Sequence, residues 1–385
     1  SVVRLPAPAP PPRRRPVGPL VPSGLAAMEA LQPLAEGQRV GLVGPPGTGK
    51  STAAGMLVRS QPPGTACVYA AQSPLSQLRA RLGGSLDSAG AALTVVYADP
   101  RSDPAGARFL VPHCALHAAL QMTASHRHVL LVLDDLVSWA QAAAELPSPP
   151  SGAPQVLASA LYAGGRVVSS GGRENALTVA AVFDLEPEDE LPTGLRALWR
   201  GAEPALDVRL DFSAALAAAG VLPAIAPMGP LSCGFAPRHQ PPLLRRLRGE
   251  LQRALREGRD LEYKAELSGP LGLPLEPQER EQLGSARVAR ALLAHTERRA
   301  LPELAVLLVA SLVYHFPDPA PPPPSMVARF QRELLGAVRG ARPALWEALS
   351  RAEHLGEEEA ETVIRDLAEV LLAHRFDFGL TRPHL

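Results

Sequence analysis

The stretch Gly44-Pro45-Pro46-Gly47-Thr48-Gly49-Lys50-Ser51 follows directly after the apolar run Val40-Gly41-Leu42-Val43. A buried strand that leads into a glycine-rich loop and then into a helix leaves several backbone N–H groups free to point at a phosphate. Lys50 adds a positive charge, and Ser51 adds a hydroxyl that can bind Mg2+. A chance glycine turn is the alternative. The pattern predicts a nucleoside triphosphate site whose binding residues are Gly44, Pro45, Pro46, Gly47, Thr48, Gly49, Lys50, Ser51 and Thr52.

Composition narrows the kinds of ligand and partner. Lys50 and Lys264 are the only lysines, so a lysine stands where phosphate binding requires one, in a chain that otherwise uses arginine. The 38 basic residues balance 38 acidic residues, and this balance does not favour nucleic acid or an anionic membrane as a partner. The longest apolar run, residues 304–313, is shorter than the ~20 residues that cross a bilayer. We expect a buried helix there and no direct membrane span.

The chain is long enough for two domains, with 385 residues of which 46% are hydrophobic. From residue 25 to about residue 234, short apolar runs alternate with helical stretches, as in a mostly parallel sheet joined by crossover helices. We expect an α/β fold in which a proline-rich linker (1–22) precedes a RecA-like phosphate-loop domain (23–235). The expected strands are 39–43, 66–70, 93–97, 128–133, 166–169 and 176–183.

The sequence changes character after Pro241, where amphipathic helices replace strands. Leu244, Leu247, Leu251 and Leu255 recur at spacings of three and four, which is typical of one buried helix face. The arginines around this face are expected to be solvated, with a partner surface as the alternative. A C-terminal helical bundle domain is therefore predicted at 236–385, with further helices at 288–294, 304–315, 326–338 and 357–373.

A second apolar strand ends in an acidic residue. Val129-Leu130-Leu131-Val132-Leu133 is followed by Asp134 and Asp135. Phosphate-loop proteins use such an aspartate to hold Mg2+. Alone, this pattern would more often mark a turn, but together with the upstream loop it predicts a metal site formed by Ser51 and Asp134.

Two segments around the loop carry a more restrictive signal. Residues 23–39 read S-G-L-A-A-M-E-A-L-Q-P-L-A-E-G-Q-R, and residues 128–136 read H-V-L-L-V-L-D-D-L. They resemble the rotary ATPase family, which typically reads T-G-I-x-A-I-D-x-L-x-P-I-x-x-G-Q-R before its phosphate loop. Within that family they are similar to the alpha type of the proton-translocating ATP synthase, which reads H-A-L-I-I-Y-D-D-L. The resemblance covers residues 17–376, with looser matches in the C-terminal helices.

The resemblance implies an ATP synthase subunit that binds ATP or ADP with Mg2+ and takes a structural or regulatory part in proton-motive-force-driven ATP synthesis. Its implied partners are the beta subunit and other alpha-type subunits of a hetero-oligomeric ring, not nucleic acid. The implied location is the matrix side of the mitochondrial inner membrane, or the cytoplasm for a bacterial protein. The family's N-terminal beta-barrel is expected to be missing, which puts ring assembly in question.

The chain departs from the family pattern at positions that carry catalysis. Gln72 follows the predicted strand 66–70, near where the beta subunit has the carboxylate that orients water, and an amide cannot act as that base. Gly234 stands where the family has its arginine finger, unless Arg238 substitutes, and Leu222 and Ala160 replace two further family arginines. We therefore expect Gln72 to belong to the nucleotide site, no residue to be catalytic, and the chain alone not to be an active enzyme.

Two other functions remain open. The first is a stand-alone nucleotide-binding paralogue that acts as an interaction or regulatory protein without ATPase activity, and the replaced finger favours it. The second is an active ATPase of the export or termination-helicase type. Such enzymes need a general base and usually a basic track, and the sequence shows neither.

Overall fold

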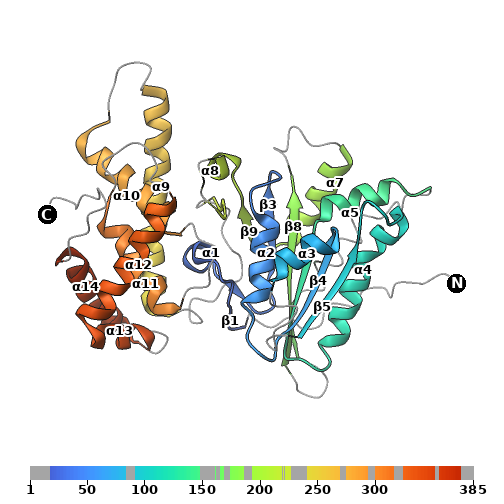
Figure 1. Cartoon of the computed structure of the whole chain (residues 1–385), viewed down its shortest axis with the longest axis horizontal. Helices are drawn as coiled ribbons and strands as arrows, with labels where there is room; N and C mark the ends of the chain where they lie inside the picture. The colour runs from blue at the N-terminus through green and yellow to red at the C-terminus, as the bar shows by residue number, and fades with distance from the viewer. Residues whose placement is uncertain are drawn as a thin grey trace. The chain divides into compact units, whose positions relative to one another are not determined.

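The computed structural model describes residues 18–83, 92–147, 161, 165–168, 174–185, 193–218, 220, 222–226, 241–268, 275–293, 300–315, 324–351 and 355–373 (Figure 1). The chain divides into two compact units. The sheet unit holds Gln32–Ala214 and the described residues before Leu25. The helical unit holds Leu25–Leu31 and the described residues from Ala215 onward.

Six parallel strands form the main sheet, in the order β5-β4-β6-β8-β3-β9. A seventh strand, β7, runs antiparallel to the first residues of β8. The predicted α/β class with a mostly parallel sheet is thereby confirmed. The strands are β3 (Arg39–Gly44), β4 (Ala66–Gln72), β5 (Ala92–Ala98), β6 (His128–Asp134), β7 (Gly165–Val168), β8 (Glu174–Asp184) and β9 (Val208–Asp211).

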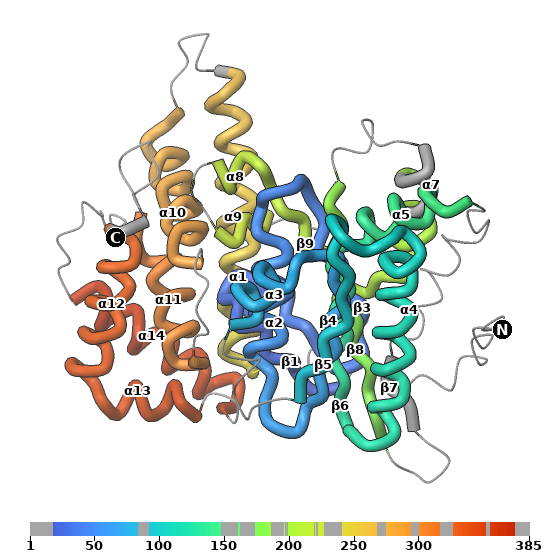
Figure 2. Tube along the Cα trace, turned by 45° about the vertical axis from the view of Figure 1, so that its right-hand side comes forward, coloured from blue at the N-terminus to red at the C-terminus, as the bar shows by residue number. Residues whose placement is uncertain are grey.

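Helices cover both faces of this sheet, which explains why the central strands are apolar without alternation. Helices α2 (Lys50–Arg59) and α3 (Leu75–Leu82) lie on one side. Helix α4 (Ala105–Met122) contacts β4, β5 and β6 from the other side, as Figure 2 shows. The carboxyl ends of the strands and the start of α2 therefore meet at one edge of the sheet, where ligands bind in open α/β folds.

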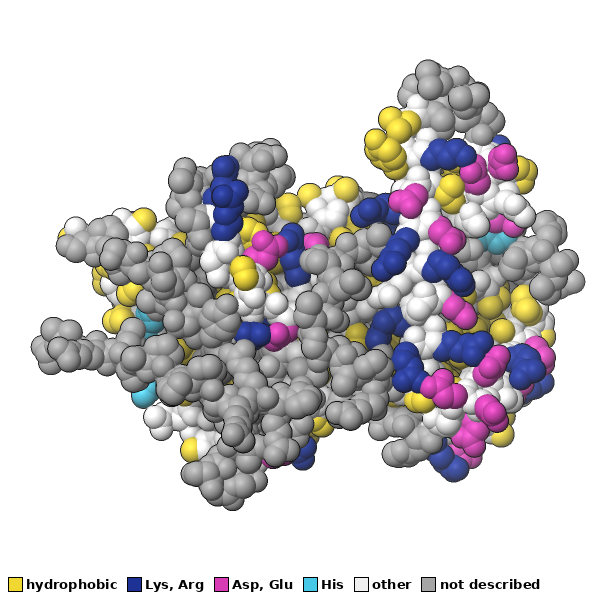
Figure 3. All heavy atoms as spheres, turned by 180° about the vertical axis from the view of Figure 1, so that it is seen from behind, with side chains coloured by type: hydrophobic (Ala, Val, Ile, Leu, Met, Phe, Trp, Pro, Cys, Tyr) yellow, Lys and Arg dark blue, Asp and Glu magenta, His cyan; other side chains and the backbone are white. Residues whose placement is uncertain are grey.

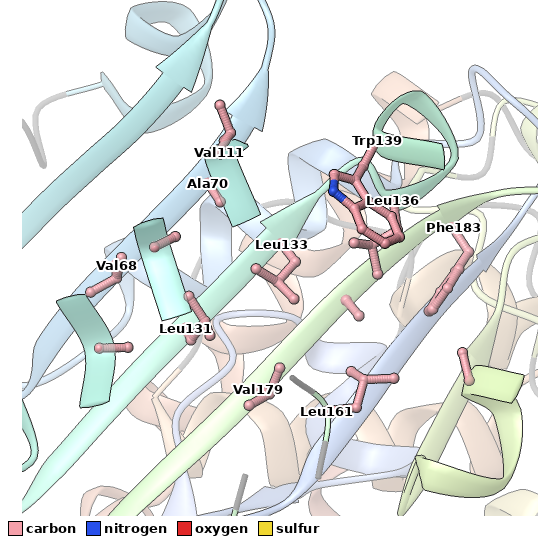
Figure 4. Close-up of a cluster of buried hydrophobic side chains, with 14 of the residues drawn as sticks. Val68, Ala70, Val111, Leu131, Leu133, Leu136, Trp139, Leu161, Val179 and Phe183 are labelled. Atoms are coloured by element: carbon pink, nitrogen blue, oxygen red, sulfur yellow. The ribbon is translucent and has the colours of Figure 1, made fainter. Parts of the chain in front are cut away.

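One buried cluster fills the α4 side of the sheet (Figure 4). Leu131, Leu133 and Val179 lie in it, because every second side chain of a strand points to the same face. Trp139 of α5 (Leu136–Ala144) stacks on Phe109 with ring centroids 5.6 Å apart, and its indole N–H donates to the Phe109 carbonyl at 3.0 Å. This packing fixes α5, and with it the end of β6.

Several short elements were not among the predicted ones. They include β9, the antiparallel pair β1 (Leu20–Val21) and β2 (Leu34–Ala35), and the helices α1 (Ala26–Leu31), α7 (Thr193–Ala202), η3 (Glu203–Ala205) and α8 (Ala214–Ala218). Strands of two to four residues show too little periodicity to be recognised. Residues 1–17 of the expected linker lie outside the described residues.

The helical unit is built around one helix that is apolar on all sides. This helix, α11, contacts α9, α10, α12, α13 and α14, so it is buried as predicted. Across the described residues, every helix is too short or too polar to span a bilayer. The helices are α9 (Pro242–Ser268), α10 (Pro277–Leu293), α11 (Leu301–Val313), α12 (Pro324–Ala341), α13 (Pro343–Ser350) and α14 (Glu357–Ala373).

Arg248 of α9 is less solvated than predicted, whereas Arg246, Arg253 and Arg256 are exposed. Arg248 is half-buried and donates to the carbonyl oxygens of Ala30, at 2.6 Å, and Glu29, at 3.1 Å. Burial lowers its pKa to about 10. Arg246 instead pairs with Glu361 of α14 at 3.0 Å. On the face shown in Figure 3, basic and acidic side chains of this unit are interspersed, so this face shows no single-sign track.

Candidate functional site

The loop between β3 and α2 has positions that only glycine accommodates well. Gly44 ends β3, where an added Cβ would lie 2.4 Å from the Phe212 carbonyl oxygen. Gly49 precedes α2 with φ 92°, in the left-handed region. The glycines at these positions therefore follow from close backbone approach and from the turn into the helix.

The N-terminus of α2 is open to a ligand. The first N–H groups of a helix have no partner within the helix, and Gly49 offers no side chain to cap them. Together with the helix dipole, these groups favour an anion. At the crest of the loop Pro46 and Gly47 are exposed, as is Thr52 in the first turn of α2, whereas Thr48 is buried and its hydroxyl donates to the Pro45 carbonyl at 2.8 Å.

Lys50 is folded back over this loop. Its side chain is 2% exposed, and its ammonium group donates to the Pro45 carbonyl and to Thr48 Oγ1, the latter at 3.1 Å. It also forms an ion pair with Asp184 Oδ1 at 2.8 Å. Asp184 ends β8, whose register places it beside Gly44.

Ser51 and Asp134 meet, as the metal-site prediction requires. The Ser51 hydroxyl donates to Asp134 Oδ1 at 2.8 Å. Asp134 Oδ2 accepts from the Tyr69 hydroxyl at 2.7 Å and from Arg81 of α3 at 3.0 Å. Burial raises the pKa of Asp134, although the bonds from Tyr69, Arg81 and Ser51 act in the opposite direction.

The adjacent Asp135 bonds to the start of α5 and not to the loop. Its carboxylate caps α5 by accepting from the backbone N–H groups of Val137, at 2.9 Å, and Ser138, at 3.2 Å. Burial, and secondarily the nearby Asp184 charge, raise the pKa of Asp135 to about 6. Of the two aspartates, Asp134 alone bonds to the loop serine.

Gln72 lies at the end of β4, next to β6, but its amide is turned to α4. Its Nε2 donates to the Arg108 carbonyl at 3.2 Å, and its buried Oε1 has no hydrogen-bond partner among the described residues. Arg108 in turn pairs with Glu145. The amide is thus held at the sheet edge by a backbone carbonyl of α4.

The oxygens of Ser51 and Asp134 suit Mg2+, which prefers hard oxygen ligands and usually binds through few protein groups together with water and phosphate. Within the described part of the chain, no three His, Cys, Asp or Glu side chains are grouped to hold a metal ion. The donor set therefore fits a metal that arrives with a phosphate ligand, and Mg2+ there would neutralise phosphate charge.

Sequence reasoning brought together Lys50, Ser51 and Asp134 but missed Asp184, Tyr69 and Arg81. Asp184 directly follows the predicted strand 176–183, so its position at a strand end was the available signal. Leu222 is described and exposed. Gly234, Arg238 and Ala160 lie outside the described residues.

Comparisons with known proteins find similarity to one family. The sequence model of the ATP synthase alpha/beta family, nucleotide-binding domain, matches residues 24–156. ATP synthase subunit alpha of Thermobifida fusca is 24% identical over 93% of this chain and 67% of its own length. ATP synthase subunit alpha of Aquifex aeolicus is 24% identical over 90% of this chain and 69% of its own length.

Identity is higher over a shorter region. ATP synthase subunit alpha of Salinispora tropica is 32% identical, over 31% of this chain and 24% of its own length. The chain therefore spans about two thirds of the length of the first two relatives and about a quarter of the third.

Proposed function

Because residues 24–156 carry the nucleotide-binding domain of the ATP synthase alpha/beta family, and ATP synthase alpha subunits are similar to most of the chain, we propose that this protein is an alpha-like ATP synthase subunit. It binds ATP or ADP with Mg2+, does not hydrolyse the nucleotide, and takes a structural or regulatory part in proton-driven ATP synthesis.

One observation supports nucleotide binding above all others. The Lys50 ammonium and the open start of α2 lie on one loop, and the Ser51 hydroxyl bonds to Asp134 at 2.8 Å. The first pair of groups suits phosphate, and the second pair suits the phosphate-linked Mg2+. A glycine turn without function would not require an aspartate from a distant strand beside its serine.

The non-catalytic part of the proposal depends on the carboxylates around the loop. Asp134 accepts three hydrogen bonds, Asp135 caps α5, and Asp184 pairs with Lys50. At the end of β4 the side chain is the amide of Gln72, which cannot take a proton from water. This amide supports the proposal that the chain does not hydrolyse the nucleotide.

The partners follow from the family. We propose beta subunits and other alpha-type subunits of a ring as partners, with no nucleic acid. The relatives compared above come from bacteria, which favours the cytoplasmic location over the mitochondrial one.

A second candidate function is a stand-alone nucleotide-binding paralogue that regulates or contacts another protein. The resemblance favours it, because about Gly234 takes the place of the family's arginine finger. An arginine finger contributes ~10³ to 10⁵ in rate where it has been measured in other nucleotide hydrolases. A subunit without it would contribute little to a neighbouring site.

Nucleotide binding is tested with the two lysines of the chain. Lys50→Ala removes the buried cation at the loop, and we expect Mg-ATP binding to fall below detection in isothermal titration calorimetry. Lys264→Ala is the matched control, because Lys264 of α9 pairs with Glu279 of α10 and both residues belong to the helical unit. Wild-type affinity in the Lys50 variant would rule out this site.

A further inference from the structure

All three N–H donors of the Lys50 ammonium group have partners in this structure. An ammonium group carries three N–H donors. Lys50 directs them to the Pro45 carbonyl, to Thr48 Oγ1 at 3.1 Å and to Asp184 Oδ1 at 2.8 Å. The cation that would bind phosphate is therefore already neutralised by a carboxylate.

Asp184 is anchored through its backbone and not through its side chain. It ends β8 in register with Gly44, and the N–H of the following Leu185 donates to the Gly44 carbonyl at 3.0 Å. Its side chain is 34% exposed, whereas that of Lys50 is 2% exposed. The Asp184 carboxylate can therefore turn toward solvent without disturbing the sheet. Movement of the buried Lys50 ammonium group out of the loop would require more free energy.

We propose that Asp184 is a resident counter-ion that occupies the phosphate position on Lys50 in the nucleotide-free protein and is displaced by the polyphosphate of a nucleoside di- or triphosphate. This inference rests on the proposed function. The two anions compete for one ammonium group, and each repels the other at close range. Apparent nucleotide affinity is lowered by the fraction of protein in which Asp184 holds the lysine.

The same pairing stabilises the empty loop. A nearly buried ammonium group that loses its carboxylate partner is left as an uncompensated charge. Removal of the Asp184 charge should therefore lower the melting temperature of the nucleotide-free protein. Bound ATP should abolish this difference, because phosphate then takes the place of the carboxylate.

The test compares Asp184→Asn with Asp211→Asn. Asp211 ends β9 on the other side of β3, and its carboxylate bonds to Arg209 at 2.6 Å, so its variant removes the same charge from the same sheet edge. ATP binding is measured by calorimetry in EDTA, where Mg2+ does not compete for carboxylates. We expect Asp184→Asn to bind ATP about tenfold more tightly than wild type, and Asp211→Asn to match wild type.

The possible results test the counter-ion role of Asp184 separately from the proposed nucleotide binding. Unchanged, weaker or undetectable ATP binding by Asp184→Asn in EDTA would overturn the counter-ion role. Asp184→Ser, which also removes the charge, must shift affinity in the same direction, and melting curves confirm that each variant is folded. Failure of wild-type protein to bind Mg-ATP would instead overturn the proposed function.

Discussion

Two adjacent residues, Asp134 and Asp135, show how surroundings assign different roles to the same side chain. Asp134 continues β6 and points to the α2 side of the sheet, where Ser51, Tyr69 and Arg81 donate to it. Asp135 is the next residue, lies beyond the end of β6, and caps α5. The first is available to a metal, and the second holds the helix that follows.

The raised pKa of Asp135 makes stability depend on pH. Its pKa is about 6 in the folded protein against an ordinary value of 3.8, so folding favours its protonated form. The associated stability is fully present below pH 4 and is lost as the pH rises through about 6. Asn keeps one oxygen to cap α5 but does not titrate.

We therefore expect Asp135→Asn to gain stability relative to wild type as the pH rises from 4 to 7.5. Between pH 4 and pH 7.5, the free energy of unfolding of Asp135→Asn should rise relative to that of wild type by on the order of 2 to 3 kcal/mol. Urea unfolding of both proteins across this pH range measures it. Parallel curves for the two proteins would show that Asp135 ionises normally.

At this scale, site residues that lie within a sequence motif could be predicted. Residues that contact them only because of the strand order or the packing of a helix could not. Lys50 and Ser51 belong to a contiguous pattern, and Asp134 ends an obvious apolar strand. Asp184 approaches Lys50 only because β8 is the neighbour of β3, and Arg81 approaches Asp134 from α3. Strand order is set by tertiary packing, and local patterns do not encode it.

At the scale of elements, helix α9 contains two glycines in opposite environments. Gly249 is exposed, and an added Cβ there would meet nothing within 4 Å. Gly258 is buried against α10, and an added Cβ would lie 2.2 Å from Ala286 Cβ. One position thus carries only the entropic cost of glycine in a helix, while the other permits close packing of two helices.

The same substitution at these two sites should have opposite effects. We expect Gly249→Ala to stabilise the protein by about 0.5 to 1 kcal/mol, because alanine favours the helix. Gly258→Ala should destabilise it by about 1 to 3 kcal/mol, because α10 must move away from α9. Chemical denaturation followed by circular dichroism measures both changes. Equal effects of the same sign would contradict the close packing of α9 and α10.

Prediction of elements succeeded where one face was clearly apolar. Helix α14 was predicted over 357–373, the bounds that the structure gives, because three acidic residues open it and its buried side is regular. Helix α10 begins well before the predicted residue 288, since its first turns are polar. The solvated arginine face predicted for α9 was wrong at Arg248, which caps α1, because no local pattern shows that α1 packs there.

At the scale of the whole molecule, every residue of the candidate site belongs to the sheet unit. Lys50, Ser51, Gln72, Asp134 and Asp184 all lie within Gln32–Ala214. The helical unit has its own core around α11. The proposed nucleotide binding therefore depends on one unit of the chain, whereas hydrolysis in a ring would also require a residue from a neighbouring subunit.

We expect the purified chain to release phosphate from ATP at the background rate. The side chain at the end of β4 is the amide of Gln72, and an amide cannot activate water. A bacterial ATP synthase beta subunit is then added, and size-exclusion chromatography shows whether a large complex forms, as a ring subunit requires and a stand-alone paralogue does not.

We also expect this complex to hydrolyse ATP slowly, because the resemblance to the family puts about Gly234 in place of its arginine finger, and glycine cannot stabilise transition-state charge. Rings assembled from the same beta subunit and an ordinary alpha subunit supply the reference rate. Rapid turnover by the isolated chain that Lys50→Ala abolishes would reveal a base within the chain. Rapid ATP hydrolysis only in the complex would show that another arginine acts as the finger. The variant Arg238→Ala then tests whether this arginine comes from this chain or from the beta subunit.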